Sequence, residues 1–591
     1  MASATLFPRA PAVAFRPEAK RCSHCDGTLR VQKTRARKVV TLHIGEIRAR
    51  ETVLVCKTCK RTERSRALRQ LVAPGGNFGY DVMVYVGRAL FLRHRTGREI
   101  VAELAVRNVA ISTSEVDRLG KTFVIYLAIA HRQSCAALQE AMRAVGGYIL
   151  HLDGTFDGRG PILMSALDSI TQIVLANVKL PSERAEVIVP FLQDVQRAFG
   201  DPIALVHDMG AGILKAVAEV FPNTPDFICH YHFLADIGKD LFGRENDWLR
   251  KHLRARGITS KLRRHARDLK RFVDADPRLV EEFCDAMAND TPPQTPPATV
   301  RAISAYSLIQ WTLDGKNQGG GYGFPFDRPH LVFAQRLARA CSQLHDVRRP
   351  NTRGAAAVDR ILFKLVRDLK MVTSDACLHE IMETMKRKTT VFDQLRHALA
   401  LAPESGSQGL NCHGMDADIQ TIEKRVKGFC RRLRESGKLA EDKAYKKLLD
   451  QIEKYEDKLF SDPIVVPTPE GEISIQPQRT NNIMERFFRA FKRGWRRKTG
   501  NGSMGKTLKT MIADTPLVAN LDNPQYINIL LAGKTTLQER FAEIDIHTIR
   551  QESKHCQEAL EKIPPKIKKL IALPQFHEKL TRIFPPNAQT A

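Results

Sequence analysis

The stretch that decides the fold is an apolar run ending in an acid, YILHLDGTF at 148–156. A second run of the same kind, IALVHDMGAG at 203–212, also ends in an aspartate that precedes a turn. Short apolar runs bounded by turn residues are typical of buried β-strands. We therefore place Asp153 and Asp208 at the ends of two strands, where their carboxylates would hold divalent metal ions for phosphodiester chemistry.

The elements around these strands alternate between β and α. Strands are expected at 148–153, 162–167, 173–180, 203–208 and 226–229, with helices at 183–199 and 211–221. Three strands, a helix, a strand, a helix and a strand is the order of an RNase H-like domain, whose first and fourth strands lie side by side. This fold would bring Asp153 and Asp208 together.

A third acid, Glu485, lies in NNIMERFFR at 481–489, where a strongly basic helix begins. At about 100° per residue, one helix face carries Glu485, Arg489, Lys492 and Arg496. The apolar face of the same helix carries Met484, Phe487, Phe488, Phe491 and Trp495. The sequence therefore predicts that the apolar face docks on the sheet, while Glu485 completes an acidic triad and the three cations hold DNA phosphates.

Each acid has a structural alternative when it is taken singly. Asp153-Gly154 is a common hairpin-turn signal, and Asp208 is well placed to cap the next helix. Asn482 and Glu485 match a capping box. None of these alternatives explains why all three acids fall where the expected fold makes them converge.

The composition agrees with a polyanionic partner. Lys and Arg number 92 against 65 acidic residues, a net charge of +27, which favours nucleic acid over the alternative of a merely solvated basic surface. No apolar stretch approaches the ~20 residues of a membrane span. Of the twelve cysteines, four form CxxC pairs, a pattern of reduced compartments with one metal site. We expect a soluble intracellular protein without membrane association.

The paired CxxC motifs predict a zinc ribbon. The four candidate ligands are Cys22, Cys25, Cys56 and Cys59. Strands expected at 39–44 and 51–55 would form a hairpin between the two pairs, giving the thiolates the tetrahedral reach that Zn²⁺ requires. Chance pairs or a redox-active CxxC are the alternatives.

The next segment has the pattern of a helix-turn-helix. Apolar residues at 100–105 and 111–119 form two stripes, with Asn108 at the turn between them. The second helix would present Thr113, Ser114 and Arg118 to DNA. A plain helical hairpin is the alternative.

The expected organisation is an α/β RNase H-like core that is interrupted by a large all-helical insertion and preceded by a zinc β-ribbon and a helix-turn-helix. Seven segments follow from the motifs and the composition. They are a flexible lead (1–20), the zinc ribbon (21–62), the helical DNA-binding segment (63–145), the first part of the core (146–243), the insertion (244–470), the second part of the core with the Glu485 helix (471–535) and a helical C-terminal appendage (536–591).

Cys229 and His232 form a CxxH pair at the end of the last expected strand. We interpret them as bracing the acidic site from behind. The alternative is a buried thiol beside a hydrogen-bonded histidine.

Together these motifs resemble those of DDE transposases. The resemblance rests on DGT at 153–155, Asp208 at a strand end, CxxH at 229–232 and NNIMERFFR at 481–489, and it covers about residues 20–505. It is strongest to the Mutator-like superfamily and related bacterial insertion-sequence transposases. That group combines an RNase H-like core with a helical insertion before the glutamate, and several members carry a zinc ribbon and a helix-turn-helix.

The resemblance implies a function. Asp153, Asp208 and Glu485 would bind two Mg²⁺ (or Mn²⁺) ions, and the ribbon would bind Zn²⁺. The enzyme would cut and join double-stranded DNA, at the terminal repeats of a mobile element and at its target, by phosphodiester hydrolysis and strand transfer. A homodimer or higher oligomer in the cytoplasm, associated with the bacterial nucleoid, is implied as well.

Two rival functions remain open from sequence. A non-catalytic, domesticated DNA-binding derivative would not need all three acids, which are present. A stand-alone metal-dependent nuclease would not need two DNA-binding modules.

Overall fold

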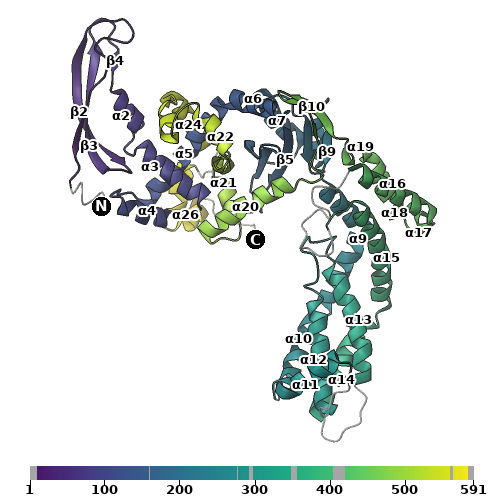
Figure 1. The fold of residues 1–591 in the computed structure, drawn as a ribbon. Coiled ribbons are helices and arrows are strands. Elements are labelled where there is room, and N and C mark those ends of the chain that lie inside the picture. The colour runs from purple at the N-terminus through teal and green to yellow at the C-terminus, as the bar shows by residue number, and fades with distance from the viewer. Residues whose placement is uncertain are drawn as a thin grey trace, which may run out of the picture. The chain divides into compact units, whose positions relative to one another are not determined.

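The chain is mixed α/β and predominantly helical (Figure 1). The computed structural model describes residues 9–158, 160–275, 277–291, 297–347, 356–402, 419–558 and 564–583. Contacts divide the chain into two compact units. Unit 1 comprises Met1–Asp226, Val465–Ile475 and Asn481–Ala591, and unit 2 comprises Phe227–Ile464 and Gln476–Thr480.

The central sheet has the strand order β7-β6-β5-β8-β9. The strands are β5 (Ile149–Thr155), β6 (Ile162–Asp168), β7 (Val174–Leu180), β8 (Ala204–His207) and β9 (Asp226–Ile228), and the first segment of unit 1 ends at the first residue of β9. β6 is antiparallel to both β5 and β7, whereas β5 and β8 are parallel. The expected sequence of strands and helices and the pairing of the first with the fourth strand are therefore both present.

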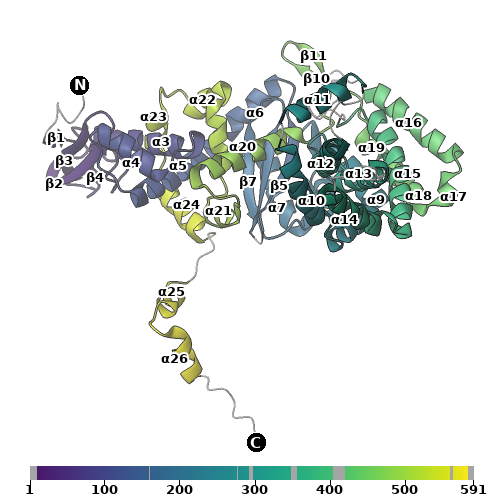
Figure 2. The same cartoon turned by 90° about the horizontal axis from the view of Figure 1, so that it is seen from below.

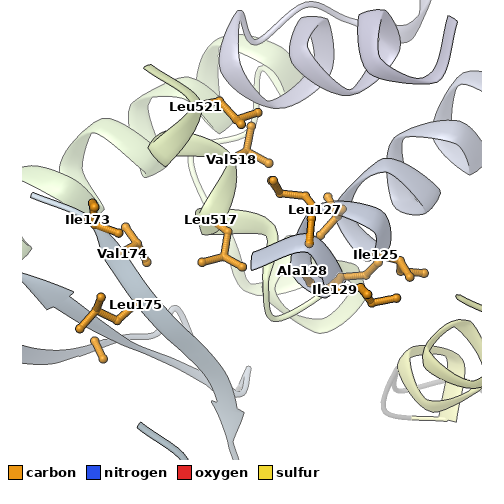
Figure 3. Packing of buried hydrophobic residues seen from close by; sticks show 14 of the residues in the cluster. Ile125, Leu127, Ala128, Ile129, Ile173, Val174, Leu175, Leu517, Val518 and Leu521 are labelled. Atoms are coloured by element: carbon orange, nitrogen blue, oxygen red, sulfur yellow. The ribbon is translucent and has the colours of Figure 1, made fainter. Parts of the chain in front are cut away.

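Helices of unit 1 cover the sheet. They include α5 (Thr113–Gln133), α6 (Cys135–Ala144), α7 (Ala185–Phe199), α8 (Ala211–Val220) and α20 (Asn482–Thr499), with the 3-10 segment η3 (Thr515–Asp522). Side chains of α5, of the stretch at 173–175 and of η3 belong to one buried apolar cluster, part of which Figure 3 shows. β8 is buried along its whole length, which explains why its sequence is an apolar run rather than an alternating one.

The N-terminal part of unit 1 is a β-ribbon followed by short helices. β2 (Leu29–Thr41) and β3 (Gly45–Cys56) pair antiparallel, and β4 (Thr62–Glu63) pairs with β3. The hairpin is longer than predicted, and its turn falls at 42–44, inside the stretch expected as the first strand. Gly45 follows this turn with a φ of +85°, a left-handed conformation that favours glycine.

The predicted flexible lead is structured from β1 (Ala12–Phe15) onward, which corrects that expectation. β1 pairs in parallel with β3, and Val13 and Phe15 pack on the small apolar cluster beneath the ribbon. The carboxylate of Glu18 accepts hydrogen bonds from the backbone N–H groups of Arg66 and Ala67 at 2.8 and 3.1 Å. The lead thus supplies an edge strand and a cap for α2 (Arg66–Leu71).

The other helices of unit 1 come from both sides of unit 2 in the sequence. They are α3 (Tyr80–Gly87), the π-helical turn η1 (Arg88–Leu92), α4 (Gly97–Val106), α21 (Gly505–Thr510), α22 (Pro524–Leu531), α23 (Leu537–Ala542), α24 (Ile546–Glu558), α25 (Pro565–Ile571) and α26 (Phe576–Ile583). The residues after 535, predicted as a helical appendage, begin inside the core. Phe541 is buried, with its ring centroid 5.8 Å from that of Phe123 and 5.3 Å from that of Tyr126.

Unit 2 consists almost wholly of helices (Figure 2). They are α9 (His230–Ala255), α10 (Ile258–Val273), α11 (Pro277–Ala288), α12 (Pro297–Asp314), α13 (Pro329–Val347), α14 (Ala356–Thr373), α15 (Ala376–Ala398), α16 (Ile419–Glu435), α17 (Lys438–Glu441), α18 (Lys443–Lys454) and α19 (Glu456–Leu459). The predicted insertion boundary at 243–244 falls inside α9, next to a kink at Phe242. The rings of Phe242 and Phe392 meet edge to face at 5.4 Å in the core of this unit.

Among the described residues, no helix has both the length and the apolar character needed to cross a membrane.

Candidate functional site

The four predicted cysteine ligands converge at the base of the ribbon. Their sulfur atoms all lie within 4.8 Å of one another, and those of Cys22 and Cys59, like those of Cys25 and Cys56, are 3.5 Å apart. Around a tetrahedral Zn²⁺ with Zn–S bonds of ~2.3 Å, sulfur atoms would be ~3.8 Å apart. The predicted clustering is confirmed, and the residues fit zinc.

The surroundings of the cysteines also suit a metal. A Cβ on Gly27 would lie 2.9 Å from the sulfur of Cys56 and 3.3 Å from that of Cys25, so only glycine leaves the sulfurs their space. Hydrogen bonds from backbone N–H groups, those of Cys59 and Thr58, lower the pKa of Cys56 to about 6. A thiol whose pKa is low is a ready thiolate ligand.

The two predicted aspartates lie at one edge of the central sheet. The parallel register pairs Leu152 with His207, so Asp153 and Asp208 are the next residues along two neighbouring strands. Asp153 and Gly154 lie inside β5 and pair with Ser165 and Met164 of β6. The hairpin-turn alternative for Asp153 is therefore wrong, because the strand continues through it.

Asp208 stands at the entry to α8. Its Oδ1 accepts a hydrogen bond from the backbone N–H of Gly210 at 3.1 Å. The preceding residue, His207, is fully buried, and its Nδ1 donates to the backbone carbonyl oxygen of Asp208 at 2.6 Å. These contacts hold the backbone of Asp208 at the end of β8.

The helix that carries Glu485 is tied to β5 by one buried side chain. Asn481 is the N-cap residue of α20, but its side chain makes no cap hydrogen bond. Instead its Nδ2 donates to the carbonyl oxygen of Leu152 at 2.8 Å, and its Oδ1 accepts from Nδ1 of His151 at 2.9 Å. The start of α20 is thereby held on the strand that bears Asp153.

The two predicted faces of α20 are present. Met484 and Phe488 are buried, and Phe487, Phe491 and Trp495 pack against the same core. Arg489 and Arg496 are exposed and Lys492 is half-buried, while Glu485 lies in the first turn with its carboxylate 3.9 Å from the guanidinium of Arg489. An acid and three cations therefore share one helix face.

The acids do not form a tight three-carboxylate cluster. Within the part of the chain that the structure describes, the cysteine group is the one set of three or more metal-ligating side chains whose atoms all lie within 4.8 Å. Among the described residues, the three acids are therefore not gathered closely enough to surround a single metal ion.

A fourth carboxylate, Glu183, belongs to the same edge and was missed from sequence. Because β7 runs parallel to β5 and β8, the residues after all three strands meet at one edge, and Glu183 follows β7. A Cβ on Gly154 would lie 3.4 Å from Oε1 of Glu183. Desolvation, and then the charge of Asp208, raise the pKa of Glu183. An acidic residue shortly after a predicted strand could have marked Glu183 as a candidate ligand, but Glu183 was interpreted from the sequence only as the start of a helix.

The helix-turn-helix segment folds as two helices, α4 and α5, around a turn. Asn108 adopts a φ of +59° there, and the Ser112 side chain caps α5 by accepting from the backbone N–H of Glu115 at 3.2 Å. Thr113, Ser114 and Arg118 are exposed on the first turns of α5. Arg118 is not freely extended, because its guanidinium forms an ion pair with Glu115.

The CxxH pair falls in unit 2, whereas the acids belong to unit 1. Cys229 is buried and is the N-cap residue of α9. His232 lies in the first turn of α9, with its ring centroid 5.5 Å from that of Tyr231. The bracing of the acidic site by these residues stays a prediction.

A scan against protein-family models and a search of curated proteins find no match to this chain.

Proposed function

We propose that this protein is a metal-dependent DNA-cutting and strand-transfer enzyme of the DDE transposase class, with an RNase H-like core. The observation that carries the proposal is the placement of Asp153 and Asp208 on adjacent parallel strands, with the Glu485 helix hydrogen-bonded to one of them. Carboxylates brought to one sheet edge from distant parts of a chain are a costly arrangement electrostatically. Bound divalent cations would offset that repulsion.

Asp153, Asp208 and Glu485 would hold two Mg²⁺ or Mn²⁺ ions, which activate water or a 3′-hydroxyl and stabilise the leaving oxygen when bound. The protein's part is positional. β5 and β8 hold the two aspartates in register, and the hydrogen bonds of Asn481 fix the start of α20 against β5. Arg489, Lys492 and Arg496, along the same face as Glu485, would hold the phosphates that flank the scissile bond.

Two modules would bring DNA to this site. The four-cysteine ribbon would fold around Zn²⁺, and the exposed first turns of α5 with Thr113, Ser114 and Arg118 would enter the major groove. Recognition of double-stranded element ends by these modules favours strand transfer at defined sites over unspecific nuclease action. Joining two ends requires two active sites, so a dimer or larger assembly is part of the proposal, as is a location on the bacterial nucleoid.

The test is metal-dependent nicking of a plasmid that carries the DNA flanking this gene on both sides. Wild type is compared with Asp153→Ala, Asp208→Ala and Glu485→Ala. The matched control is Asp201→Ala, since Asp201 precedes β8 at the opposite sheet edge and accepts a hydrogen bond from Gln196. We expect Mg²⁺-dependent nicking that is lost in the three variants and kept in the control, with DNA binding retained throughout.

Equal binding without nicking in wild type and variants would instead indicate a DNA-binding derivative. Nicking of any plasmid, with or without the flanking DNA, would indicate a nuclease.

A further inference from the structure

Unit 2 contains a groove between α10 and α12 that no step of the proposed chemistry uses. Its volume is about 970 Å³. α10 contributes Arg263, Arg267 and Lys270, α12 contributes Tyr306 and Gln310, and the turn after α12 contributes Lys316. All six side chains carry hydrogen-bond donors, and four of them are cations.

The cations of α10 form a row. Arg263, Arg267 and Lys270 are spaced at i, i+4 and i+7, which places them on one helix face. The opposite face is anchored, because Leu262, His265 and Leu269 are buried. The row is therefore held in line by the packing of the helix.

The cations on the two sides of α10 differ in their partners. Where α10 packs against α14, Lys261 and Arg264 have Asp368 as a partner, at 3.7 and 3.5 Å. In the groove, Arg263 and Arg267 have no acidic partner among the described residues.

The acids near the groove do not neutralise these two arginines. Asp274 binds Lys270 at 2.6 Å. Asp314 also lines the groove, but it accepts from Gln318 at 2.6 Å and pairs with Arg336 at 3.4 Å. The groove is thus left with an excess of positive charge.

Lys316 adds to this excess from the other side. Its ammonium contacts the hydroxyl of Thr259 and lies 4.2 Å from the centre of the Phe333 ring. Burial, and then the nearby charge of Arg263, lower the pKa of Lys316. Lys316 and Arg263 are therefore like charges lining one groove, and a bound anion would relieve their repulsion.

We propose that this groove binds the phosphate backbone of DNA, as a contact surface carried by unit 2 alone. At ~1.5 Å per residue, the row from Arg263 to Lys270 spans ~10 Å. A DNA strand carries one phosphate per ~3.4 Å of axis, so the row faces several successive phosphates. A single small anion would not occupy its length, and Tyr306 and Gln310 add neutral donors along the opposite wall.

This inference goes beyond the proposed function, because DNA held here need not be DNA that is cut. The experiment uses the full chain and measures fluorescence anisotropy of a labelled DNA duplex of arbitrary sequence over a series of salt concentrations. Wild type is compared with the double variant Arg263→Ala/Arg267→Ala. Arg431→Ala/Arg432→Ala, two exposed arginines of α16 outside the groove, is the matched control.

We expect the groove variant to raise Kd about tenfold at moderate salt and to flatten the slope of log K against log salt by about two, one unit for each lost phosphate contact. The control should stay near wild type. Arg263→Lys/Arg267→Lys should restore the slope, which excludes misfolding as the cause of the loss. An unchanged slope in the alanine variant, or an equal loss in the control, would overturn the inference.

Two further measurements, of vesicle binding and of DNA cleavage, distinguish a DNA contact from a membrane contact and from the cutting site. If the groove variant loses binding to vesicles of anionic lipid while its binding to DNA is unchanged, the groove is a membrane contact and the inference is wrong. A wild-type chain that cuts nothing but binds DNA through the groove would refute the proposed function and keep this inference. If the wild-type chain cuts DNA and the groove variant binds DNA as tightly as wild type, the proposed function is supported and this inference is refuted.

Discussion

Asn481 and His151 stand 330 positions apart in the chain and are joined by a hydrogen bond of 2.9 Å between Oδ1 of the first and Nδ1 of the second. Both side chains are fully buried. The same amide donates to the carbonyl oxygen of Leu152, the residue before Asp153. The bond therefore sets the position of the Glu485 helix against the strand that carries the first aspartate.

Removing the Asn481 amide should loosen that connection. Asn481→Ala leaves a buried ring N–H and a buried carbonyl without this partner, which costs about 1–3 kcal/mol for each buried group. We expect a lower denaturant midpoint for unit 1 and reduced metal-dependent cleavage, measured by urea unfolding and by plasmid nicking. The control Asn289→Ala removes an exposed amide that follows directly after α11 and donates to a carbonyl of that helix, and it should leave both unchanged. Full nicking by Asn481→Ala would refute the positioning role.

Burial of His151 makes unit 1 sensitive to acid. Burial lowers the pKa of His151 to about 4 from its ordinary 6.5, so the unfolded chain takes up this proton at a higher pH than the folded chain. The free energy of unfolding is therefore intact above about pH 6.5 and falls toward pH 4, by about 3 kcal/mol for a group shifted this far. His151→Gln should show a shallower loss of stability between pH 7 and pH 5 in urea titrations.

The matched control for this pH dependence is His547→Gln, which replaces an exposed histidine of α24. It should keep the wild-type slope. A His151→Gln slope equal to that of wild type would show that other groups dominate the acid sensitivity. His131, whose pKa burial also lowers to about 4, is the next residue to test in that case.

Replacing Glu183 should affect thermal stability in opposite directions with and without metal. Its raised pKa reflects desolvation and repulsion from Asp208, so Glu183→Gln should leave the metal-free protein as stable as wild type or more stable. With Mg²⁺ present, wild type should gain more in Tm than the variant, because one carboxylate that would attract the ions is gone. Calorimetry with and without Mg²⁺ measures both changes. Glu219→Gln, an exposed glutamate of α8, should match wild type in both conditions, and an equal Mg²⁺ gain in Glu183→Gln would remove Glu183 from the site.

The cysteine cluster should hold one Zn²⁺ per chain and depend on it for folding. Chelation, or Cys56→Ser, should expose the ribbon at 21–62 to protease and weaken DNA binding, while the α/β core stays folded. Zinc release into a chelating dye, limited proteolysis and anisotropy measure these effects. Cys284→Ser, an exposed cysteine of α11, should retain the zinc. A ribbon that is resistant to protease after complete chelation would contradict the structural role.

The sequence predicted most strands of the central sheet, because a buried strand is apolar along its own length. The run from Ile149 to Leu152 is largely apolar whichever strand pairs with it. The cysteine spacing likewise restricts which sulfurs can meet. Glu183 was not recognised because its distance from Asp208 depends on β7 and β8 running in the same direction, which no local pattern encodes.

Two further differences between the predicted and the observed fold also depend on contacts between residues far apart in the chain. β1 forms because the free edge of β3 offers backbone hydrogen-bond partners, and Phe541 is buried because Phe123 and Tyr126, about 400 positions earlier, leave an apolar surface for it. By itself the sequence determined the two apolar runs that lead into Asp153 and Asp208, the cysteine motifs and the two faces of α20, since each follows from neighbours within a few residues; that β5 continues past Asp153 to Thr155 was not predicted. Only the tertiary structure decided that Asn481 anchors α20 on β5 and that the α10 row lines an open groove, because both depend on contacts between residues far apart in the chain.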